Sequence, residues 1–273
     1  MYKILEKEVL APAIKRIKVR APLIAQKTRP GNFIILRVND KGERIPLTIA
    51  DYEENTGIIS LVFQEIGYTT KLLGSLNKGE YIEDIVGPLG QHIDVEGYDK
   101  VVLLGGGSGT ALLYPKVKAF YEAGSEVIAI TGARTKNLIF LEDELKEASD
   151  RLYVATDDGS YGHHGFVTDI LDDILEEEKV DLVMAIGPVP MMKAIVDMTE
   201  KEDIKTIVSL NSLMVDGTGM CGACRVTVGG ETKFTCIDGP AFDGHKVDFD
   251  ELMSRINFYE EEEELLQDEK EVN

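Results

Sequence analysis

The chain contains three cysteines, Cys221, Cys224 and Cys236, all within one short stretch of its 273 residues. An odd number of cysteines cannot all pair within one chain, and such tight clustering favours metal binding over a disulfide framework. The Cys-x2-Cys spacing puts two thiolates on one turn, close enough to share a metal. Glycines at positions 217, 219 and 222 let the backbone approach inorganic sulfide and donate N–H groups to it.

The fourth ligand is predicted from spacing. Asp216 lies five residues before Cys221, so the pattern is Asp-x4-Cys-x2-Cys-x11-Cys. Plant-type ferredoxins use Cys-x4-Cys-x2-Cys followed by a distant cysteine. A carboxylate oxygen can bind ferric iron, so the pattern predicts a [2Fe–2S] cluster held by Asp216, Cys221, Cys224 and Cys236. The alternatives are a zinc site, free structural thiols, and His245 as the fourth ligand.

A glycine-rich turn follows the apolar stretch that begins at Val101. Small residues at the start of a helix let a pyrophosphate approach exposed N–H groups and the positive end of the helix dipole. The turn departs from strict G-x-G-x-x-G. The predicted pyrophosphate site consists of Gly106, Gly107, Ser108, Gly109, Thr110 and Ala111.

The next predicted strand ends near Gly132 and Arg134, without an acidic residue to hold a ribose 2′-hydroxyl. The usual marker therefore does not decide between NAD and NADP. Arg134 could favour a 2′-phosphate or contact pyrophosphate.

Two further loops follow predicted strands, at the edge where open α/β sheets bind ligands. One contains Asp157 and Asp158, and the other runs over Gly187, Pro188, Met191 and Met192. Each loop alone could be an ordinary turn before a helix. Three such loops in register favour a nucleotide site.

An extended stretch near the N-terminus contains Arg44, Pro46, Leu47 and Thr48. The arginine could pair with phosphate, and the threonine could give a hydroxyl or backbone N–H to a flavin ring. Gly67, Thr69 and Thr70 open a predicted helix and form a second candidate anion site. The structural alternative is that threonine at a helix start is simply an N-cap.

Residues 1–97 show short apolar or alternating runs separated by turn residues, which predict an antiparallel β-barrel. The predicted strands are Ala13–Val19, Asn32–Val38, Leu47–Asp51, Gly57–Val62 and Tyr81–Val86, with one helix at Thr69–Ser75.

Residues 98–209 alternate strand and helix patterns, which predict a doubly wound parallel sheet. The predicted strands are Lys100–Leu104, Glu126–Thr131, Leu152–Thr156, Leu182–Ala185 and Lys205–Ser209. The predicted helices are Thr110–Glu122, Asn137–Ala148, Val167–Glu177 and Met191–Lys201.

Residues 210–250 lose this periodicity and are rich in glycine. We expect such a segment to bury little apolar surface and to need a bound metal to stabilise its fold. Residues 251–273 are expected to form an acidic helix or tail. Its last fifteen residues carry eight acids and one lysine, which suits a solvated tail or docking to a basic partner.

The net charge of −20 argues against nucleic-acid binding, because no basic surplus exists to neutralise phosphates. Apolar runs are far too short for a membrane span, and the N-terminus has no apolar signal-type region. We therefore expect a soluble, cytoplasmic protein.

Taken together, residues 1–205 resemble the ferredoxin–NADP reductase superfamily. With the cysteine segment, the whole chain resembles the electron-transfer subunits of dihydroorotate dehydrogenase and their relatives. The stretch Ser212–Val226, with Asp216 in the first ligand position, looks like the cluster signature of the small (alpha) subunits of electron-bifurcating NADH-dependent reduced ferredoxin:NADP oxidoreductases. Sulfide dehydrogenase beta subunits look very similar, whereas dihydroorotate dehydrogenase subunits carry cysteine at that position.

The resemblance implies an antiparallel FAD-binding barrel, a doubly wound NAD(P)-binding domain and a C-terminal [2Fe–2S] segment. It assigns the first flavin loop to Arg44, Pro46, Leu47 and Thr48, and a flavin-contact strand to Val62, Phe63 and Gln64. It assigns the flavin pyrophosphate loop to Gly67, Thr69 and Thr70, and the nicotinamide pyrophosphate loop to Gly106–Ala111. The loops near the nicotinamide are assigned to Asp157, Asp158 and Gly187–Met192. Ile45 stands where many relatives place arginine.

The resemblance further implies an oxidoreductase subunit that passes electrons between NAD(H), FAD and the cluster, without a general acid or nucleophile. The implied partner is a larger subunit with flavin and [4Fe–4S] that binds NADP(H) and ferredoxin, giving a heterodimer. The alternatives are a dihydroorotate dehydrogenase subunit, a stand-alone NAD(P)H reductase for ferredoxin or polysulfide, and a zinc-stabilised nucleotide sensor.

Overall fold

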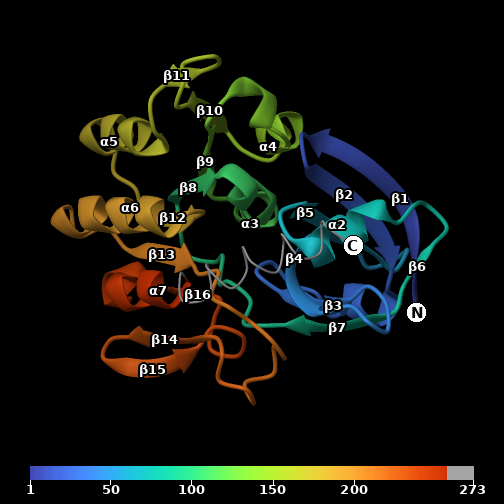
Figure 1. Cartoon of the computed structure of the whole chain (residues 1–273). Helices are drawn as coiled ribbons and strands as arrows, with labels where there is room; N and C mark the ends of the chain where they lie inside the picture. The colour runs from blue at the N-terminus through green and yellow to red at the C-terminus, as the bar shows by residue number, and fades with distance from the viewer. Residues whose placement is uncertain (257–273) are drawn as a thin grey trace.

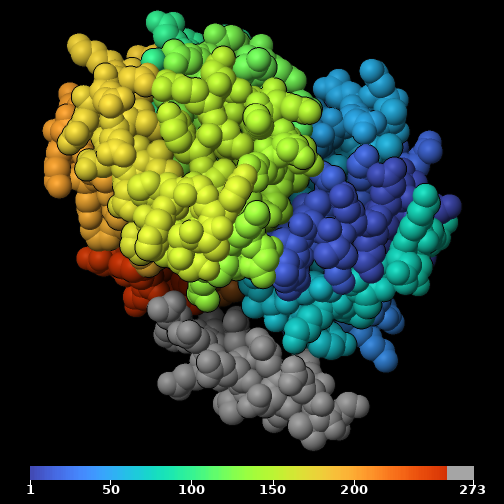
Figure 2. Space-filling model, turned by 90° about the horizontal axis from the view of Figure 1, so that it is seen from above, coloured from blue at the N-terminus to red at the C-terminus, as the bar shows by residue number. Residues whose placement is uncertain are grey.

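A computed structural model describes residues 1–256 of the chain, so most of the acidic tail lies outside the described residues. Two seven-stranded sheets and a two-stranded hairpin make up the β structure of this part. The N-terminal sheet, in blue and cyan, lies against the green, yellow and orange α/β domain (Figures 1 and 2). None of the described helices has the length and apolar character required to cross a membrane.

The N-terminal sheet is an antiparallel, nearly closed barrel. Its strand order is β6-β1-β2-β5-β4-β3-β7. The stretch from β6 to β7 pairs first with β1 and then with β3, which brings the two edges of the sheet together. The elements are β1 (Tyr2–Ala11), β2 (Ile14–Arg20), α1 (Pro22–Ala25), β3 (Phe33–Arg37), β4 (Arg44–Glu53), β5 (Ile58–Gln64), α2 (Tyr68–Ser75), β6 (Tyr81–Ile82) and β7 (Asp84–Leu89).

Side chains along β5 alternate between the barrel core and the interface with the neighbouring domain. Ile59, Leu61 and Phe63 point into the barrel core. Val62, between them, packs outside the barrel in a cluster that includes Ala111 of the neighbouring domain. Successive side chains of a strand point to opposite faces, so one strand serves the barrel core and the domain interface.

The second sheet has the order β11-β10-β9-β8-β12-β13-β16. Strands β8 to β13 are parallel, and the order reverses between β8 and β12, which is where open α/β sheets bind ligands. Its elements are β8 (Lys100–Gly106), α3 (Thr110–Glu122), β9 (Glu126–Ala133), α4 (Glu142–Glu147), β10 (Arg151–Thr156), β11 (His163–His164), α5 (Val167–Glu177), β12 (Leu182–Ile186), α6 (Val189–Lys201), β13 (Thr206–Ser209) and β16 (Ala241–Asp243).

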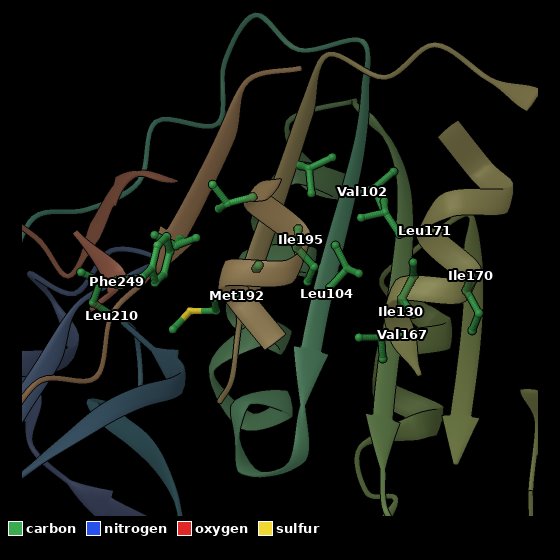
Figure 3. Packing of buried hydrophobic residues seen from close by; sticks show 14 of the residues in the cluster. Val102, Leu104, Ile130, Val167, Ile170, Leu171, Met192, Ile195, Leu210 and Phe249 are labelled. Carbon is green, nitrogen blue, oxygen red and sulfur yellow. The ribbon is translucent and has the colours of Figure 1, made fainter. Parts of the chain in front are cut away.

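Helices cover both faces of this sheet. On one face, Val102 and Leu104 of β8 pack against α5 and α6 (Figure 3). On the other, Val101 and Leu103 pack against Val117 of α3. The doubly wound prediction is confirmed, and α3 and α5 have the predicted bounds.

Two local predictions differ from the structure. The helix expected over Asn137–Ala148 is shorter and consists of α4 (Glu142–Glu147) alone. It begins late because Phe140 and Leu141 pack towards the barrel and Leu141 has a left-handed φ of 58°. Strand β1 was not predicted, since only Ile4 and Ala11 of its ten residues are buried and half of the others are charged.

The C-terminal segment also differs from its prediction. It forms the hairpin β14 (Arg225–Val228) and β15 (Glu231–Phe234), adds β16 antiparallel to β13, and ends in α7 (Phe249–Ile256). Val226, Phe242 and Phe249 join the same core as α6. The expectation of little apolar burial was therefore wrong. These apolar residues are irregularly spaced, so no period reveals them.

Candidate functional site

A cleft of about 930 Å³ lies between the barrel and the C-terminal ends of the parallel strands. Small-molecule sites typically occupy about 300–1,000 Å³, so this cleft is near the upper end. It brings together eighteen of the twenty-four residues predicted for cofactor binding. These are Pro46, Leu47, Thr48, Val62, Phe63, Gln64, Thr70, Gly106, Gly107, Ser108, Gly109, Ala111, Gly132, Arg134, Asp157, Gly187, Pro188 and Met191.

The barrel wall of the cleft comes from β4, β5 and the start of α2. Thr48 on β4 pairs with Phe33 on β3, which fixes its place in the sheet. At α2, the Thr70 hydroxyl accepts hydrogen bonds from the N–H groups of Ile66 and Gly67, at 3.1 Å each. Thr70 therefore shapes the loop that lines the cleft.

The start of α3 forms the centre of the cleft. Gly109 packs so closely on the end of β12 that an added Cβ would lie 2.5 Å from the Ile186 carbonyl oxygen. Thr110 is buried, and its hydroxyl lies 2.8 Å from that of Thr131 on β9. Thr110 thus holds the helix against the sheet while its neighbours line the cleft.

The aspartates after β10 have different surroundings. The Asp157 N–H donates to the Ala133 carbonyl at 3.2 Å, and its side chain is exposed at the cleft. Asp158 does not line the cleft. It accepts a 3.0 Å hydrogen bond from the Ser160 N–H, and its hydrogen bonds with Ser160 lower the pKa of the Asp158 carboxyl.

Five other predicted residues do not line the cleft. Arg44 is exposed on β4 opposite Arg37, and Gly67 precedes α2. Thr69 is buried with its hydroxyl 3.4 Å from Glu43 Oε2. Thr110 was described above. The Met192 side chain is fully buried in the core beneath the sheet, so it is not available to a ligand in the cleft (Figure 3).

The candidate metal site is separate from the cleft lining. The Cys224 and Cys236 sulfurs are buried and 3.2 Å apart, next to Phe33 and Ile35 of the barrel. Burial, with the neighbouring Cys224 thiol, raises the pKa of the Cys236 thiol to about 12. Metal binding must displace that proton, because the thiolate is the ligand form.

The other two predicted ligands form a second pair. The Asp216 carboxylate accepts hydrogen bonds from the N–H groups of Thr218, at 2.7 Å, and Cys221, at 2.9 Å. These bonds hold the pKa of the Asp216 carboxyl below its ordinary value. The Cys221 side chain is exposed.

This arrangement fits a binuclear cluster. A [2Fe–2S] cluster has two protein ligands on each iron, and the four side chains come as two pairs. Within residues 1–256, no three His, Cys, Asp or Glu side chains meet as a site for a single metal ion. His245, the rival ligand, instead lies 3.2 Å from the Thr199 hydroxyl through Nε2.

Comparison with known proteins finds two family matches along the chain. Residues 211–248 match the iron–sulfur cluster binding domain of dihydroorotate dehydrogenase B, and residues 103–197 match an oxidoreductase NAD-binding domain. The chain is 46% identical to the dihydroorotate dehydrogenase B (NAD(+)) electron transfer subunit homolog of Thermotoga maritima, over 97% of this chain and 94% of the relative. It is 32% identical to the corresponding subunit of Fusobacterium nucleatum, over 83% and 90%.

The chain belongs to the family of dihydroorotate dehydrogenase B electron-transfer subunits.

Among solved structures, that of an NADH-dependent reduced ferredoxin–NADP oxidoreductase, studied for flavin-based electron bifurcation, matches with a TM-score of 0.94. Its identity is 44%, over 100% of this chain and 98% of the other. A ferredoxin NADP+ reductase from Neisseria gonorrhoeae shares the fold at a TM-score of 0.60 and 16% identity, over 73% and 89%.

This family member is an oxidoreductase subunit, and its cofactors are FAD, an iron–sulfur cluster and NAD(H). The family match supports the iron–sulfur interpretation over zinc and free thiols. It also leaves the zinc-stabilised sensor without support.

Sequence reasoning missed several residues that line the cleft. Phe140 and Phe166 reach it from loops before α4 and α5, and Ser209 and Asn211 reach it from the end of β13. The phenylalanines carry no local signal. The other two follow a correctly predicted strand, so the ligand-binding edge of the sheet could have drawn attention to them.

Proposed function

We propose that this chain is the small subunit of an electron-bifurcating NADH-dependent reduced ferredoxin:NADP oxidoreductase. The observation that carries the proposal is the TM-score of 0.94 at 44% identity, with both chains almost entirely covered. Asp216, in place of a first cysteine, supports this branch of the family. The proposed domains are 1–97 for FAD, 98–209 for NAD(H), 210–250 for the cluster, and 251–273 as an acidic helix or tail.

The cleft is assigned to both nucleotides. Pro46, Leu47 and Thr48 would hold the flavin ring, and the start of α3 would hold the NAD(H) pyrophosphate. When bound, the flavin exchanges hydride with nicotinamide and single electrons with the cluster. The chain itself contributes binding, alignment and exclusion of water, so Asp157 would position the nucleotide and transfer no proton.

The cluster is assigned to the two ligand pairs, Asp216 with Cys221 and Cys224 with Cys236. An Asp216→Cys substitution tests this directly. We expect the variant to retain its iron and show a shifted reduction potential, because a thiolate replaces a carboxylate on one iron. A potential and visible spectrum identical to those of the unaltered protein would remove Asp216 from the ligand set.

Apolar side chains exposed around the cluster loop support a protein partner. Leu213, Val215, Met220 and Ile237 are between 40% and 88% exposed. A local gathering of exposed apolar side chains is typical of an interaction surface. The proposed partner is a larger subunit with flavin and [4Fe–4S] that binds NADP(H) and ferredoxin, forming a heterodimer.

We place the complex in the cytoplasm. Cytoplasmic thiols stay reduced, which suits the three unpaired cysteines.

Purification of the untagged protein from its natural source tests the proposal. We expect a larger subunit to co-purify at constant ratio, and NADP+ reduction to require both NADH and reduced ferredoxin. Co-purification with a dihydroorotate-oxidising subunit would favour the alternative, which the Fusobacterium relative supports. An active chain without any partner would favour a stand-alone reductase.

A further inference from the structure

The end of β13 places two polar side chains in the cleft that neither the family match nor the sequence motifs assign a role. Ser209 is only 4% exposed, yet it lines the cleft. Within residues 1–256, the buried side-chain nitrogen and oxygen atoms that lack a hydrogen-bond partner are limited to Arg37 Nε, so the Ser209 hydroxyl is not a buried, unpartnered group. Asn211 lines the same cleft and is exposed. A hydroxyl and an amide that line the same cleft can both hydrogen-bond to a polar group of a ligand bound there.

The local backbone explains why both side chains reach the cleft. Leu210 is 3% exposed and packs into the core under the sheet (Figure 3). Side chains of an extended segment alternate between faces, so Ser209 and Asn211 share the face opposite Leu210. The Leu210 N–H donates to the Pro240 carbonyl at 2.9 Å, and Ser212 hydrogen-bonds the Thr235 hydroxyl. The segment is therefore fixed on both sides of Asn211.

The sheet order indicates which part of the dinucleotide lies here. The pyrophosphate loop follows β8, at the centre of the sheet. Arg134 and Asp157 follow β9 and β10 on one side, while Ser209 and Asn211 follow β13 on the other. The barrel strand β3, which pairs with Pro46 and Thr48 of β4, packs against Met214. The flavin-side wall thus adjoins the chain segment that continues from Asn211.

We propose that Ser209 and Asn211 bind the carboxamide of the nicotinamide ring and position it against the flavin. This inference rests on the proposed function, which assigns the cleft to both nucleotides. A carboxamide offers one acceptor oxygen and an NH2 donor. A serine hydroxyl and an asparagine amide can each donate and accept, so together they can satisfy both. The assignment makes them positioning residues with no part in proton transfer.

The experiment compares two ligands that differ only by the nicotinamide ring. Binding of NAD+ and of ADP-ribose is measured by calorimetry on the purified protein, with its cofactors and any co-purifying subunit. We expect Ser209→Ala and Asn211→Ala each to raise the Kd for NAD+ by about tenfold, the loss of roughly one hydrogen bond. The Kd for ADP-ribose should stay within about twofold of the unaltered protein, since the lost bond is made only to nicotinamide.

Ser108→Ala provides the matched serine control at the pyrophosphate loop, where it should affect NAD+ and ADP-ribose equally. Equal weakening of both ligands by Ser209→Ala, or no change in NAD+ binding, would overturn the inference. An unaltered protein that binds neither ligand would overturn the proposed function as well.

A second measurement needs no variant. Nicotinic acid adenine dinucleotide carries a carboxylate in place of the carboxamide and lacks its NH2 donor. We expect the unaltered protein to bind this analogue more weakly than NAD+. Equal affinity for the two would count against carboxamide recognition.

Discussion

The nucleotide cleft takes its lining from the ends of elements held in two seven-stranded sheets, whereas the cysteine segment has only a two-stranded hairpin and one edge strand. Backbone geometry fixes the cleft, as at Gly109, where no room exists for a side chain. Side chains fix the segment. Ser212 bonds Thr235, and the Thr235 hydroxyl donates to the Cys224 carbonyl at 2.9 Å. The two sites should therefore respond separately to substitution unless a change reaches the core they share.

Cys224→Ser should give the largest effect and remove one site alone. We expect iron content to fall to near zero while FAD content and NAD+ binding are retained, because Cys224 does not line the cleft. Iron content, FAD content and the Kd for NAD+ are measured on one preparation. Met220→Ala, at a side chain 88% exposed in the same loop, should keep its iron. Parallel loss of iron and FAD in Cys224→Ser would mean that the sites are not separable.

Phe242→Ala tests the core shared by the two regions. Phe242 lies on β16, is 9% exposed, and packs with β13 and α6. Truncating a buried phenylalanine typically costs about 3–5 kcal/mol. We expect denaturant unfolding to show that the free energy of unfolding falls by an amount in this range. We expect NAD+ affinity and iron content to fall together. Phe166→Ala, at a side chain 62% exposed, should cost far less. A similar loss in both variants would show that β16 is not anchored in the core.

Gly109→Ala should affect the cleft alone. A methyl group 2.5 Å from the Ile186 carbonyl must push the start of α3 away from β12. We expect NAD+ affinity to fall by at least about tenfold, since the pyrophosphate depends on those N–H groups. Iron content should not change. Unchanged NAD+ affinity would show that α3 does not hold the pyrophosphate.

Glu178→Gln should give the smallest effect, at the opposite end of the parallel sheet from the cleft. Arg151 donates to Glu178 at 2.5 and 2.7 Å and Lys100 at 2.6 Å, which lowers the pKa of the Glu178 carboxyl to about 2. A carboxyl group whose pKa is lowered in the folded protein stabilises the fold at pH values above its ordinary pKa. This stabilisation is lost as the pH falls towards 2. The unaltered protein should therefore have a higher melting temperature than the variant at neutral pH. The difference between the two melting temperatures should narrow below about pH 4.5.

Glu177→Gln, at the exposed neighbouring glutamate, serves as the control and should leave the melting temperature at neutral pH close to that of the unaltered protein. A melting-temperature difference between Glu178→Gln and the unaltered protein that stays constant down to pH 2 would contradict the assigned pKa. Substitution at either position should leave NAD+ binding and iron content unchanged.

The same contrast explains what the sequence could predict. The x4-x2-x11 spacing and the glycine turn after Val101 are local signals. The structure places the glycine turn at the cleft and the four predicted ligands in two pairs. Met192 was predicted for the cleft from its loop position and the family resemblance, but the helical turn of α6 directs it into the core. Phe140 and Ser209 depend on the meeting of the barrel, α4 and β13, which no short stretch of sequence encodes.

The central claim is that two ligand pairs hold a [2Fe–2S] cluster in the C-terminal segment. Iron, acid-labile sulfide and zinc analysis of the anaerobically purified protein tests it most directly. The account predicts two irons and two sulfides for each chain, with a broad visible absorption that NADH bleaches. One zinc for each chain and no sulfide would contradict it.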